Sequence, residues 1–579
     1  SVTVMTTRTE RTEEIATHAT LQAFGNSYLR EIDMIEWFIP TDQENIWFGE
    51  MACRIDVGTI YVLEIRRRSR IGRHEIGRIY RQTSCGWTEE APLTFIIACC
   101  QHLQRLAPGV TDLLYRVLDS HRGMCHVIAH ELNEPVYPET FLEHEQTVRF
   151  GHWFHPTPKS RVGMHDWEQV AYAPEFRNGF QLDYFAVNES LLTEASATDQ
   201  WISEQMRKQL GSAVALSASE RLLPAHPLQA QHLLLQPSVQ RLLATNQLRH
   251  LGRLGPTYFA TSSIRTVLQA DRSHMLKFSI PVQVTNSRRV NKRHELTAGL
   301  VMRRLAEQIS FPDGFSITHD PAYATVQTGA DESGFEVIYR EGQDDAINVA
   351  ALVQEPLDQE PSVLASLVLK SKRTDQSLSQ AARDWFETYI ELTLGTLVEL
   401  YEHYGIALEA HQQNSLIRFE QGRPVSYQFR DNQGYYLARS NKNQLIELEA
   451  SLAEAPELFY DETTIKERLT YYMIWNHLAG LIHRFDRDGL LAESTMLEWV
   501  GTWCDQKSQI LSGRGKDWLE YIRSRPTLPY KANLLTRLHA LDELEVSGER
   551  VIFIEIDNPL HREVRHANDE RTTCLQTTS

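Results

Sequence analysis

Apolar residues recur every three or four positions in several stretches of the chain, which places them on one face of an α-helix. In residues 10–33 the repeating residues are Ile15, Leu21, Phe24, Tyr28 and Ile32. The same spacing of apolar residues recurs over residues 378–400. Glycine commonly ends a helix, and Gly405 follows this stretch. We therefore predict helices at these two places, and shorter helices over residues 92–106 and 291–308.

Short stretches of β-branched or alternating residues lie between these helices and predict strands. The predicted strands span residues 51–64, 75–81, 278–285, 334–340, 406–408, 415–419 and 425–429. Gln421 and Gly422 are typical turn residues between the last two strands, so we expect a hairpin there. Residues 341–361 are acidic and contain two prolines, which indicates a loop near a domain boundary.

The order of these elements divides the chain into three parts. At 579 residues the chain exceeds what one hydrophobic core normally supports, so two or three domains are expected. We predict a mostly helical domain over residues 1–145 and a domain of alternating strands and helices over residues 146–365. Residues 366–579 are expected to form a helix-rich domain. The predicted fold class is α+β.

The net charge of the chain limits the classes of partner that we expect. Lysine and arginine total 58 against 76 aspartate and glutamate residues, a net charge of −18. Nucleic acids and anionic membranes favour basic surfaces, so we expect neither as a main partner. The seven cysteines form no Cys-x-x-Cys pair, and no apolar run is long enough to span a bilayer. These features indicate a reducing, cytoplasmic setting.

A proline-stiffened loop carries the first group of candidate binding residues. It reads Gly-His-Trp-Phe-His-Pro-Thr-Pro-Lys over residues 151–159. The prolines restrict the backbone around His155 and Lys159, so little conformational entropy remains to be lost on binding. Both side chains donate hydrogen bonds to anionic oxygens, which suits a polyphosphate. A surface loop with incidental histidines has the same composition, and both interpretations stay open on these residues alone.

A second group of cations follows at residues 261–289. Ser262 and Ser263 precede Arg265, a pattern typical of an anion-binding turn, and Arg265 can grip a phosphate or carboxylate through two nitrogens. Lys277 and Arg289 add two more positive charges. If Lys277 begins the predicted strand, alternate polar residues up to position 285 share its face. The group therefore predicts a binding site for a small anion.

Carboxylate and amide side chains come later in the chain. Glu409, Asn414 and Asp431 offer the hard oxygen ligands that Mg²⁺ prefers while phosphates fill its remaining positions. His411 is available as a donor to a substrate. A polar hairpin with ordinary turn hydrogen bonds is the alternative. Together with the earlier cations, these residues indicate an ATP-using enzyme without a P-loop.

The order of these motifs resembles the NRPS-independent siderophore synthetases, the family of the aerobactin and achromobactin synthetases. The resemblance is carried by His-Pro-x-x-Lys at residues 155–159, Leu-Pro-Ala-His-Pro at 223–227, residues 261–266, 277–289 and 409–414, Arg-Asp at 430–431 and Leu-Pro-Tyr-Lys at 528–531. Each motif is weak alone, but their shared order is specific. They cover most of the chain beyond the first 140 residues.

The resemblance implies a cupped hand of three domains. The thumb, fingers and palm would correspond to residues 1–145, 146–365 and 366–579, with a mixed sheet in the fingers and many helices in the palm. The implied activity uses ATP and Mg²⁺ to adenylate a carboxylate of citrate or a citrate derivative. An amine or amino-alcohol acceptor then attacks the acyl adenylate. Dimerisation is common in the family, so a homodimer is expected.

The resemblance also implies roles for individual residues. The implied nucleotide-binding residues are His155, Ser262, Ser263, Arg265, Lys277, Arg340, Asn414 and Asp431. Of these, the implied catalytic residues are His155, Arg265 and Lys277. The implied carboxylate-binding residues are Arg289, His411 and Lys531. The implied Mg²⁺ ligands are Glu409, Asn414 and Asp431.

Two other functions compete with this one. A kinase-like phosphotransferase would also place Asn414 and Asp431 beside a metal, but it would release ADP rather than AMP and pyrophosphate. A non-catalytic or redox protein that handles ferric siderophores is the second alternative, because the C-terminal third of the family resembles ferric-siderophore reductases. An iron–sulfur reductase needs a set of cysteines, and only Cys504 and Cys574 lie in that third.

Overall fold

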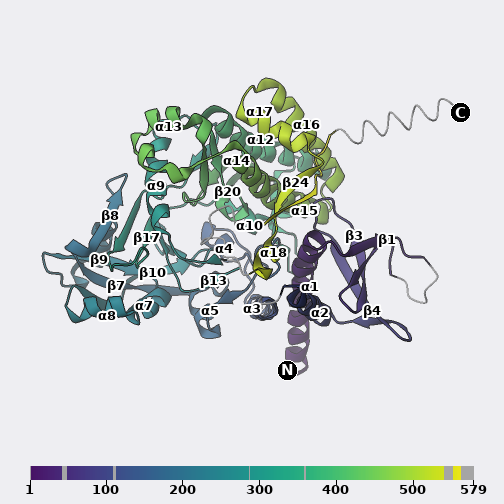
Figure 1. The fold of residues 1–579 in the computed structure, drawn as a ribbon, viewed down its shortest axis with the longest axis horizontal. Helices are drawn as coiled ribbons and strands as arrows, with labels where there is room; N and C mark the ends of the chain where they lie inside the picture. Colours follow the sequence, from purple (N-terminus) through teal and green to yellow (C-terminus); the bar gives the residue numbers. More distant parts are fainter. Residues whose placement is uncertain are drawn as a thin grey trace.

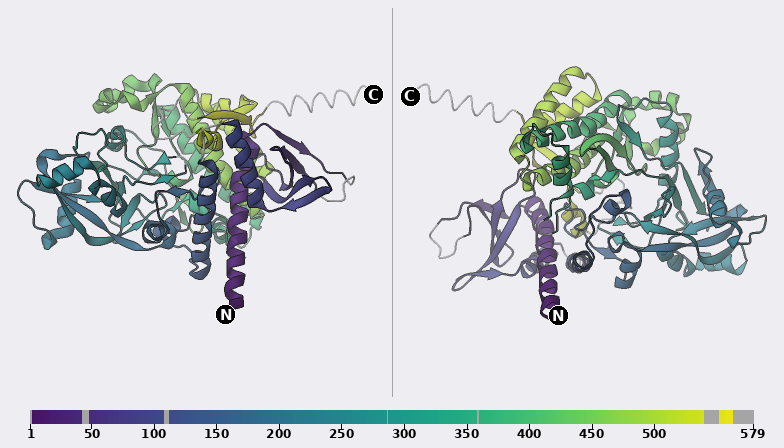
Figure 2. Two further views of the ribbon diagram at one scale, coloured as in Figure 1. Left: turned by 60° about the horizontal axis from the view of Figure 1, so that its bottom comes forward. Right: turned by 180° about the vertical axis from the view of Figure 1, so that it is seen from behind.

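The computed structural model describes residues 2–41, 48–107, 112–285, 287–357, 360–539 and 552–562. Figure 1 shows the N-terminal sheet and the largest sheet at opposite ends of the molecule, with the C-terminal helices above and between them. The further views show helices separating the two sheets from other directions (Figure 2). This mixture of helices and strands confirms the predicted α+β class. The boundaries at residues 145 and 365 stay predictions.

The N-terminal part contains helices and a five-stranded antiparallel sheet. Its main helices are α1 (Val2–Glu31), α2 (Pro92–Leu106) and α3 (Leu113–Asn133), and its strands are β1 (Ile35–Phe38), β2 (Ala52–Asp56), β3 (Ile60–Arg67), β4 (Glu75–Thr83) and β5 (Gly86–Glu90). The helices predicted over residues 10–33 and 92–106 are confirmed. The strand predicted over residues 51–64 is two strands, because Gly58 turns the chain with a φ of 93°. The sequence pattern missed β1 and β5, so this part is less helical than predicted.

The middle part is built on an eight-stranded sheet. Its order is β8 (Leu192–Ser196), β16 (Ala322–Val326), β17 (Val337–Glu341), β12 (His274–Phe278), β11 (Thr266–Gln269), β10 (Leu248–Ala260), β7 (Gly179–Asn188) and β9 (Glu220–Ala225). Every neighbouring pair in it is antiparallel. The expected mixed sheet was therefore wrong here. Strands β10, β11 and β12 follow one another through short turns, and such connections allow only antiparallel pairing.

Lys277 lies near the end of a strand and does not begin one. Strand β12 stops at Phe278, and a separate short strand, β13 (Gln283–Val284), follows. The predicted strand over residues 278–285 was wrong because Pro281 has no N–H to donate to a ladder. Lys277 pairs with Thr266 on β11 and with Ile338 on β17, and Arg340 lies two residues beyond Ile338 on the same face. The sheet therefore turns Lys277 and Arg340 to one side.

The C-terminal part follows the predicted elements closely. Helix α12 (Leu378–Tyr404) ends at Gly405, whose φ is 67°. Strands β19 (Ile406–Leu408), β20 (Ser415–Glu420) and β21 (Arg423–Phe429) follow, and the Gln421–Gly422 turn has positive φ at both residues. The later helices include α14 (Glu462–Leu469), a π-helix at Thr470–Leu478, α15 (Ala479–Arg487), α16 (Glu493–Ile510) and α17 (Arg514–Ser524). None of the helices in the described part of the chain combines the length and the apolar character needed to cross a bilayer.

The segment between the middle and C-terminal parts is more structured than predicted. Residues 341–361 were expected to form a loop, but strand β18 (Ile347–Asn348) and helix α10 (Val349–Leu352) lie within them. Asn348 caps α10, because its side chain accepts a hydrogen bond from the backbone N–H of Ala351 at 2.8 Å. Residues 358–359 lie outside the described residues. Strand β18 pairs with β20, which fixes this segment beside the C-terminal part.

A buried carboxylate joins the first and last parts of the chain. Glu31, at the end of α1, accepts hydrogen bonds from the backbone N–H groups of Leu534 and Leu535 at 3.1 and 3.0 Å. These two residues lie in the first turn of helix α18 (Asn533–Leu538). Burial raises the pKa of Glu31 to about 7, although these two N–H groups favour its charged form.

We expect this carboxylate to make stability depend on pH. A carboxyl group with a folded pKa above its unfolded pKa binds more protons when folded, so stability falls as pH rises between the two values. Between about pH 4.5 and 7 the loss approaches about 1.4 kcal/mol per pH unit. Relative to Glu31→Gln, the wild-type melting temperature should therefore fall over this interval. The exposed Glu36→Gln serves as the control, and equal pH slopes in wild type and Glu31→Gln would contradict the assignment.

Candidate functional site

All of the predicted site residues line one cavity of about 300 Å³. The residues are His155, Ser262, Ser263, Arg265, Lys277, Arg289, Arg340, Glu409, His411, Asn414, Asp431 and Lys531. They come from the loop at residues 151–159, the turn between β10 and β11, strands β12 and β17, the segment after β14 (Ser287–Arg288), the segment between β19 and β20, the segment after β21, and strand β24 (Thr527–Lys531). The structure thus brings together groups that lie more than 350 residues apart in the sequence.

The turn at residues 261–266, which we call the serine turn, has an uncommon backbone conformation. Ile264 has a φ of 72°, which is strained for a β-branched residue. The N–H of Thr261 donates to the carbonyl of Thr266 at 2.9 Å, and Ser263 Oγ accepts from the Thr266 N–H at 3.2 Å. These bonds close the turn and place Arg265 directly before β11. Most sequences can form an unstrained turn. A strained turn is therefore typical of a place where the shape of the backbone matters for binding.

Three buried cations face the cavity from the sheet and the turn. Lys277 Nζ donates to Asp431 Oδ1 at 2.7 Å and to Gln433 Oε1 at 2.9 Å. Arg340 donates to both oxygens of Asp320 at 2.7 and 3.2 Å, and its Nη2 also lies 3.6 Å from Asp431 Oδ1. Arg265 Nη1 is buried and has no hydrogen-bond partner among the described residues. This nitrogen is therefore a donor available to a ligand.

The protonation of these groups follows from burial and from their neighbours. Burial, opposed by the charge of Glu295 and assisted by that of Arg289, lowers the pKa of Arg265 to about 10, so Arg265 stays cationic near neutral pH. Burial also lowers the pKa of Lys277, against the opposing effect of Asp431. Burial alone would raise the pKa of Asp431, but Lys277 and Arg340 hold it well below its usual range. The cavity therefore contains ionised groups of both signs.

The carboxylate side of the cavity is built by backbone contacts. The N–H of Glu409 donates to the carbonyl of Gly434 at 2.9 Å, and the Asn414 side-chain amide donates to the carbonyl of Glu409 at 3.0 Å. Asp431 has a φ of 72°, and its carbonyl accepts from the N–H of Gly434 at 3.0 Å. Burial, and secondarily the charge of Asp431, raise the pKa of Glu409. The two carboxylates are thus close enough to repel each other.

The acid-binding candidates lie at the edges of the same cavity. Arg289 donates to the carbonyl of Val284 at 3.2 Å and to Thr285 Oγ1 at 3.3 Å. Lys531 Nζ lies 5.9 Å from the ring centres of both Tyr471 and Tyr472.

Of the two histidines of the site, His155 is buried and His411 is partly buried. His411 Nε2 lies 3.8 Å from Glu409 Oε1, and burial lowers the pKa of His411 to about 3, so it is neutral at physiological pH. The ring of His155 lies 4.7 Å from that of His152, in an edge-to-face arrangement.

Lys159 has a different position from the one its sequence context suggested. Its ammonium donates to Glu175 at 2.6 Å and to the carbonyl of Val148 at 2.7 Å, and its side chain is only 4% exposed. Arg161 pairs with the same carboxylate. Lys159 lines the cavity, but its charge is compensated by Glu175. We conclude that it holds the loop in place, whereas His155 faces the cavity.

Sequence analysis missed Glu145, which lies at the centre of a buried network. Glu145 ends the short helix α4 (Phe141–Glu145) and accepts from Arg430 Nη1 and Nη2 at 2.7 and 3.2 Å. It also accepts from the N–H and hydroxyl of Ser262 and from the side chain of Asn348. Gln413 donates to the Ser262 hydroxyl at 3.1 Å. No local sequence pattern distinguishes Glu145 from a surface glutamate, so only its partners could reveal this role.

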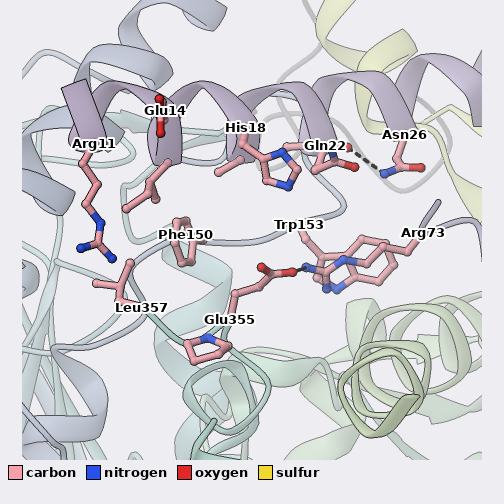
Figure 3. Close-up of a pocket in the computed structure, with 14 residues that line it drawn as sticks. Arg11, Glu14, His18, Gln22, Asn26, Arg73, Phe150, Trp153, Glu355 and Leu357 are labelled. Carbon is pink, nitrogen blue, oxygen red and sulfur yellow. Dashed lines mark hydrogen bonds and ion pairs between the residues drawn. The ribbon is translucent and has the colours of Figure 1, made fainter. Parts of the chain in front are cut away.

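A second cavity, of about 360 Å³, lies beside helix α1 (Figure 3). Arg11, His18 and Gln22 point into it from the helix, and Arg73 Nη2 lies 3.7 Å from Glu355 on its other side. Phe150 and Trp153 also line it, so the loop that carries His155 contributes to both cavities. None of the predicted site residues lines this second cavity.

Comparisons with known proteins place the chain in a family. Residues 140–368 match the IucA/IucC family, and residues 383–546 match the family described as ferric iron reductase FhuF-like transporter. The chain is 35% identical to a spermidine-citrate ligase of Bacillus anthracis, over 95% of this chain and 99% of that protein. It is 32% identical to a rhizobactin siderophore biosynthesis protein of Rhizobium meliloti, over 93% and 97% of the two chains. The chain belongs to the NRPS-independent siderophore synthetases.

A solved structure of this family has the same fold. ATP-bound aerobactin synthetase IucA of Klebsiella pneumoniae superposes with a TM-score of 0.83 at 25% identity, covering 94% of this chain and all of that one. As a member of the siderophore synthetases, the protein is a ligase of siderophore biosynthesis. The match to the FhuF-like family concerns the C-terminal part. In the described residues of that part, Cys504 is the only cysteine, which does not suffice for an iron–sulfur cluster.

Proposed function

We propose that this siderophore synthetase uses ATP to adenylate a carboxylate of citrate, or of a citryl intermediate, and transfers the acyl group to an amine or amino-alcohol acceptor. The observation that carries the proposal is the cavity itself. Arg265, Lys277, Arg289 and Arg340 line it together with Glu409 and Asp431. ATP and citrate are both highly anionic, so a site that binds them side by side needs this density of positive charge.

The nucleotide phosphates fit the side of the cavity formed by the turn and the sheet. Arg265 offers the buried Nη1 donor, and Lys277 and Arg340 lie on the neighbouring strands. Ser262, Ser263 and His155 line the same space. In the structure Lys277 and Asp431 neutralise each other at 2.7 Å, so a phosphate that takes Lys277 would leave Asp431 for a cation. The ATP-bound relative supports this use of the cavity.

The carboxylate side has the ligands expected for Mg²⁺. The pKa of Glu409 is raised by burial and by the charge of Asp431, and a divalent cation beside both would relieve their repulsion. Asn414 donates its amide N–H to the Glu409 carbonyl, which leaves its oxygen as a further ligand. Glu409, Asn414 and Asp431 therefore fit Mg²⁺. When bound, the ion would neutralise charge on the phosphates.

The acid substrate would lie between these two groups. Arg289, His411 and Lys531 can hold its carboxylates, and the attacking carboxylate itself serves as the nucleophile toward the α-phosphate. Holding the two reactants in line and stabilising the developing charge would supply most of the rate enhancement. A catalytic serine or cysteine nucleophile is not needed for this chemistry. Homodimerisation stays a prediction.

The acceptor is proposed to be an amine. The relatives include a spermidine-citrate ligase and an L-2,3-diaminopropanoate–citrate ligase, which is 26% identical over 94% of this chain. The amine must be uncharged when it attacks the acyl adenylate. A polyamine, a diamine and an amino alcohol all offer such a group.

The reaction products test the proposal. With ATP, Mg²⁺, citrate and hydroxylamine as a generic acceptor, we expect pyrophosphate and AMP in equal amounts. Omitting Mg²⁺ should abolish their release, and 2-oxoglutarate in place of citrate should be a poor substrate. Release of ADP would favour the kinase-like alternative instead. If neither product forms with citrate or with a citryl monoamide, the enzymatic proposal fails.

Arg289→Ala should separate acid binding from nucleotide binding. Losing a hydrogen-bonded charge at the acid site costs about 1.5–3 kcal/mol, so the KM for citrate should rise roughly 10- to 100-fold. The KM for ATP should change less than about threefold, because Arg265, Lys277 and Arg340 remain. The neighbouring exposed Arg288→Ala is the matched control. An unchanged KM for citrate in Arg289→Ala would remove Arg289 from the acid site.

A further inference from the structure

Helices α1 and α3 pack against each other and bring together three side chains that the proposed reaction does not use. Figure 2 shows these helices side by side over part of their length. Glu13 comes from α1, and His121 and Cys125 come from α3. His121 and Cys125 are four residues apart, so they lie on one face of α3, one turn from each other.

The ligand atoms of the three side chains form a compact triangle. Cys125 Sγ lies 3.5 Å from Glu13 Oε2 and 3.8 Å from His121 Nε2, and His121 Nε2 lies 3.9 Å from Glu13 Oε1. In tetrahedral zinc sites, bond lengths of about 2.0–2.3 Å place the ligand atoms roughly 3.3–3.7 Å from one another. The two Glu13 distances involve different carboxylate oxygens, and with one ligand atom from each residue the three atoms lie within 4.8 Å of one another, so side-chain rotations must draw them together around an ion.

We propose that Glu13, His121 and Cys125 bind a zinc ion that links α1 to α3. A thiolate, an imidazole nitrogen and a carboxylate are the three ligand types that Zn²⁺ uses, and the sulfur disfavours Mg²⁺ and Ca²⁺. Among the described residues, this is the one group of three or more His, Cys, Asp and Glu side chains whose ligand atoms converge in this way. A water molecule completes a tetrahedral shell.

A neighbouring hydroxyl uses the histidine nitrogen of the proposed site. Thr17, one turn after Glu13, places its hydroxyl 3.1 Å from His121 Nε2, so a zinc ion would replace this hydrogen bond. Zinc binds the thiolate form of a cysteine and the neutral form of a histidine, so binding at Cys125 releases the thiol proton to solvent. Zinc affinity therefore rises with pH.

The site is separate from the proposed catalytic chemistry. Glu13, His121 and Cys125 line neither of the two cavities, whereas the adjacent Glu14 lines the cavity of Figure 3. Zinc there would act by fixing α1 on α3 rather than by contacting ATP or citrate. Variants that lack the site should consequently release pyrophosphate at the wild-type basal rate in a buffer that is free of zinc and contains Mg²⁺.

Metal titration of the full-length protein tests this proposal. After removal of bound metals, wild type should bind one Zn²⁺ more than Cys125→Ser or His121→Ala. Zn²⁺ should raise the melting temperature of wild type but not that of these two variants. Co²⁺ in place of Zn²⁺ should produce a sulfur-to-cobalt charge-transfer band in the near ultraviolet, which only a cysteine ligand gives. Raising the pH from 6.5 to 8 should strengthen binding about tenfold or more, because one proton is released.

Three matched variants make the result specific. Cys85→Ser replaces an exposed cysteine, His126→Ala removes the next histidine along α3, and Glu14→Gln alters the residue beside Glu13; all three should retain the extra ion. Equal zinc stoichiometry in wild type, Cys125→Ser and His121→Ala would overturn the proposal. So would a cobalt spectrum without the charge-transfer band, or one that Cys125→Ser leaves intact.

Discussion

Lys277→Ala should lower pyrophosphate release about 100- to 1,000-fold, as expected when one preorganised charge at a reacting group is removed. Lys277 is buried, and β11 and β17 hold its strand on both sides. Its backbone is therefore fixed, and only its ammonium must exchange Asp431 for a phosphate. The loss should fall mainly on kcat, because the developing charge would be greatest in the transition state.

The variant should still fold, which makes the kinetic result interpretable. Without Lys277, Asp431 retains Arg340 Nη2 at 3.6 Å and the nearby charge of Arg265. The buried carboxylate is consequently not left alone. Lys208→Ala is the control, because Lys208 is exposed and pairs with Glu204 on its own helix, α6 (Ile202–Leu210), at 3.4 Å. Activity near the wild-type level in Lys277→Ala would show that this lysine is structural.

Glu145→Ala should lower the free energy of unfolding by about 3–5 kcal/mol, because removing one partner leaves Arg430 as a buried, uncompensated charge. The side chain of Glu145 is fully buried and that of Arg430 is 4% exposed. Glu145 also receives hydrogen bonds from Ser262 and Asn348, so its loss should loosen the serine turn as well. Urea unfolding followed by circular dichroism measures the change.

An exposed glutamate provides the comparison for this experiment. Glu134 is 73% exposed and lies 4.0 Å from Arg177, so Glu134→Ala should change the unfolding free energy by less than about 1 kcal/mol. Glu145→Gln keeps the shape of the side chain and an acceptor oxygen. It should therefore lower the free energy of unfolding by an amount between those of the other two variants. A change below about 1 kcal/mol for Glu145→Ala would show that Arg430 finds another partner.

Local sequence patterns were sufficient for several elements. Helix α12 was predictable from its long apolar face and from Gly405, and the β20–β21 hairpin from its turn residues. Both signals act within a few residues, so distant contacts do not change them. The strand at Lys277 was mispredicted because its alternate polar positions suggested one continuous strand, whereas Pro281 has no N–H for a ladder and two separate strands form.

The sequence by itself determined the family, the helices with strong periodicity, and the residues that gather in the cavity, because these depend on short motifs and their order. The tertiary structure decided how those residues are paired. It joined Lys277 to Asp431 and Lys159 to Glu175, and it made Glu145 the centre of a buried network. It also made the large sheet antiparallel and brought Glu13 to His121 and Cys125. Most of these contacts join residues far apart in the chain, and the burial that shifts their charges exists only once the chain has folded.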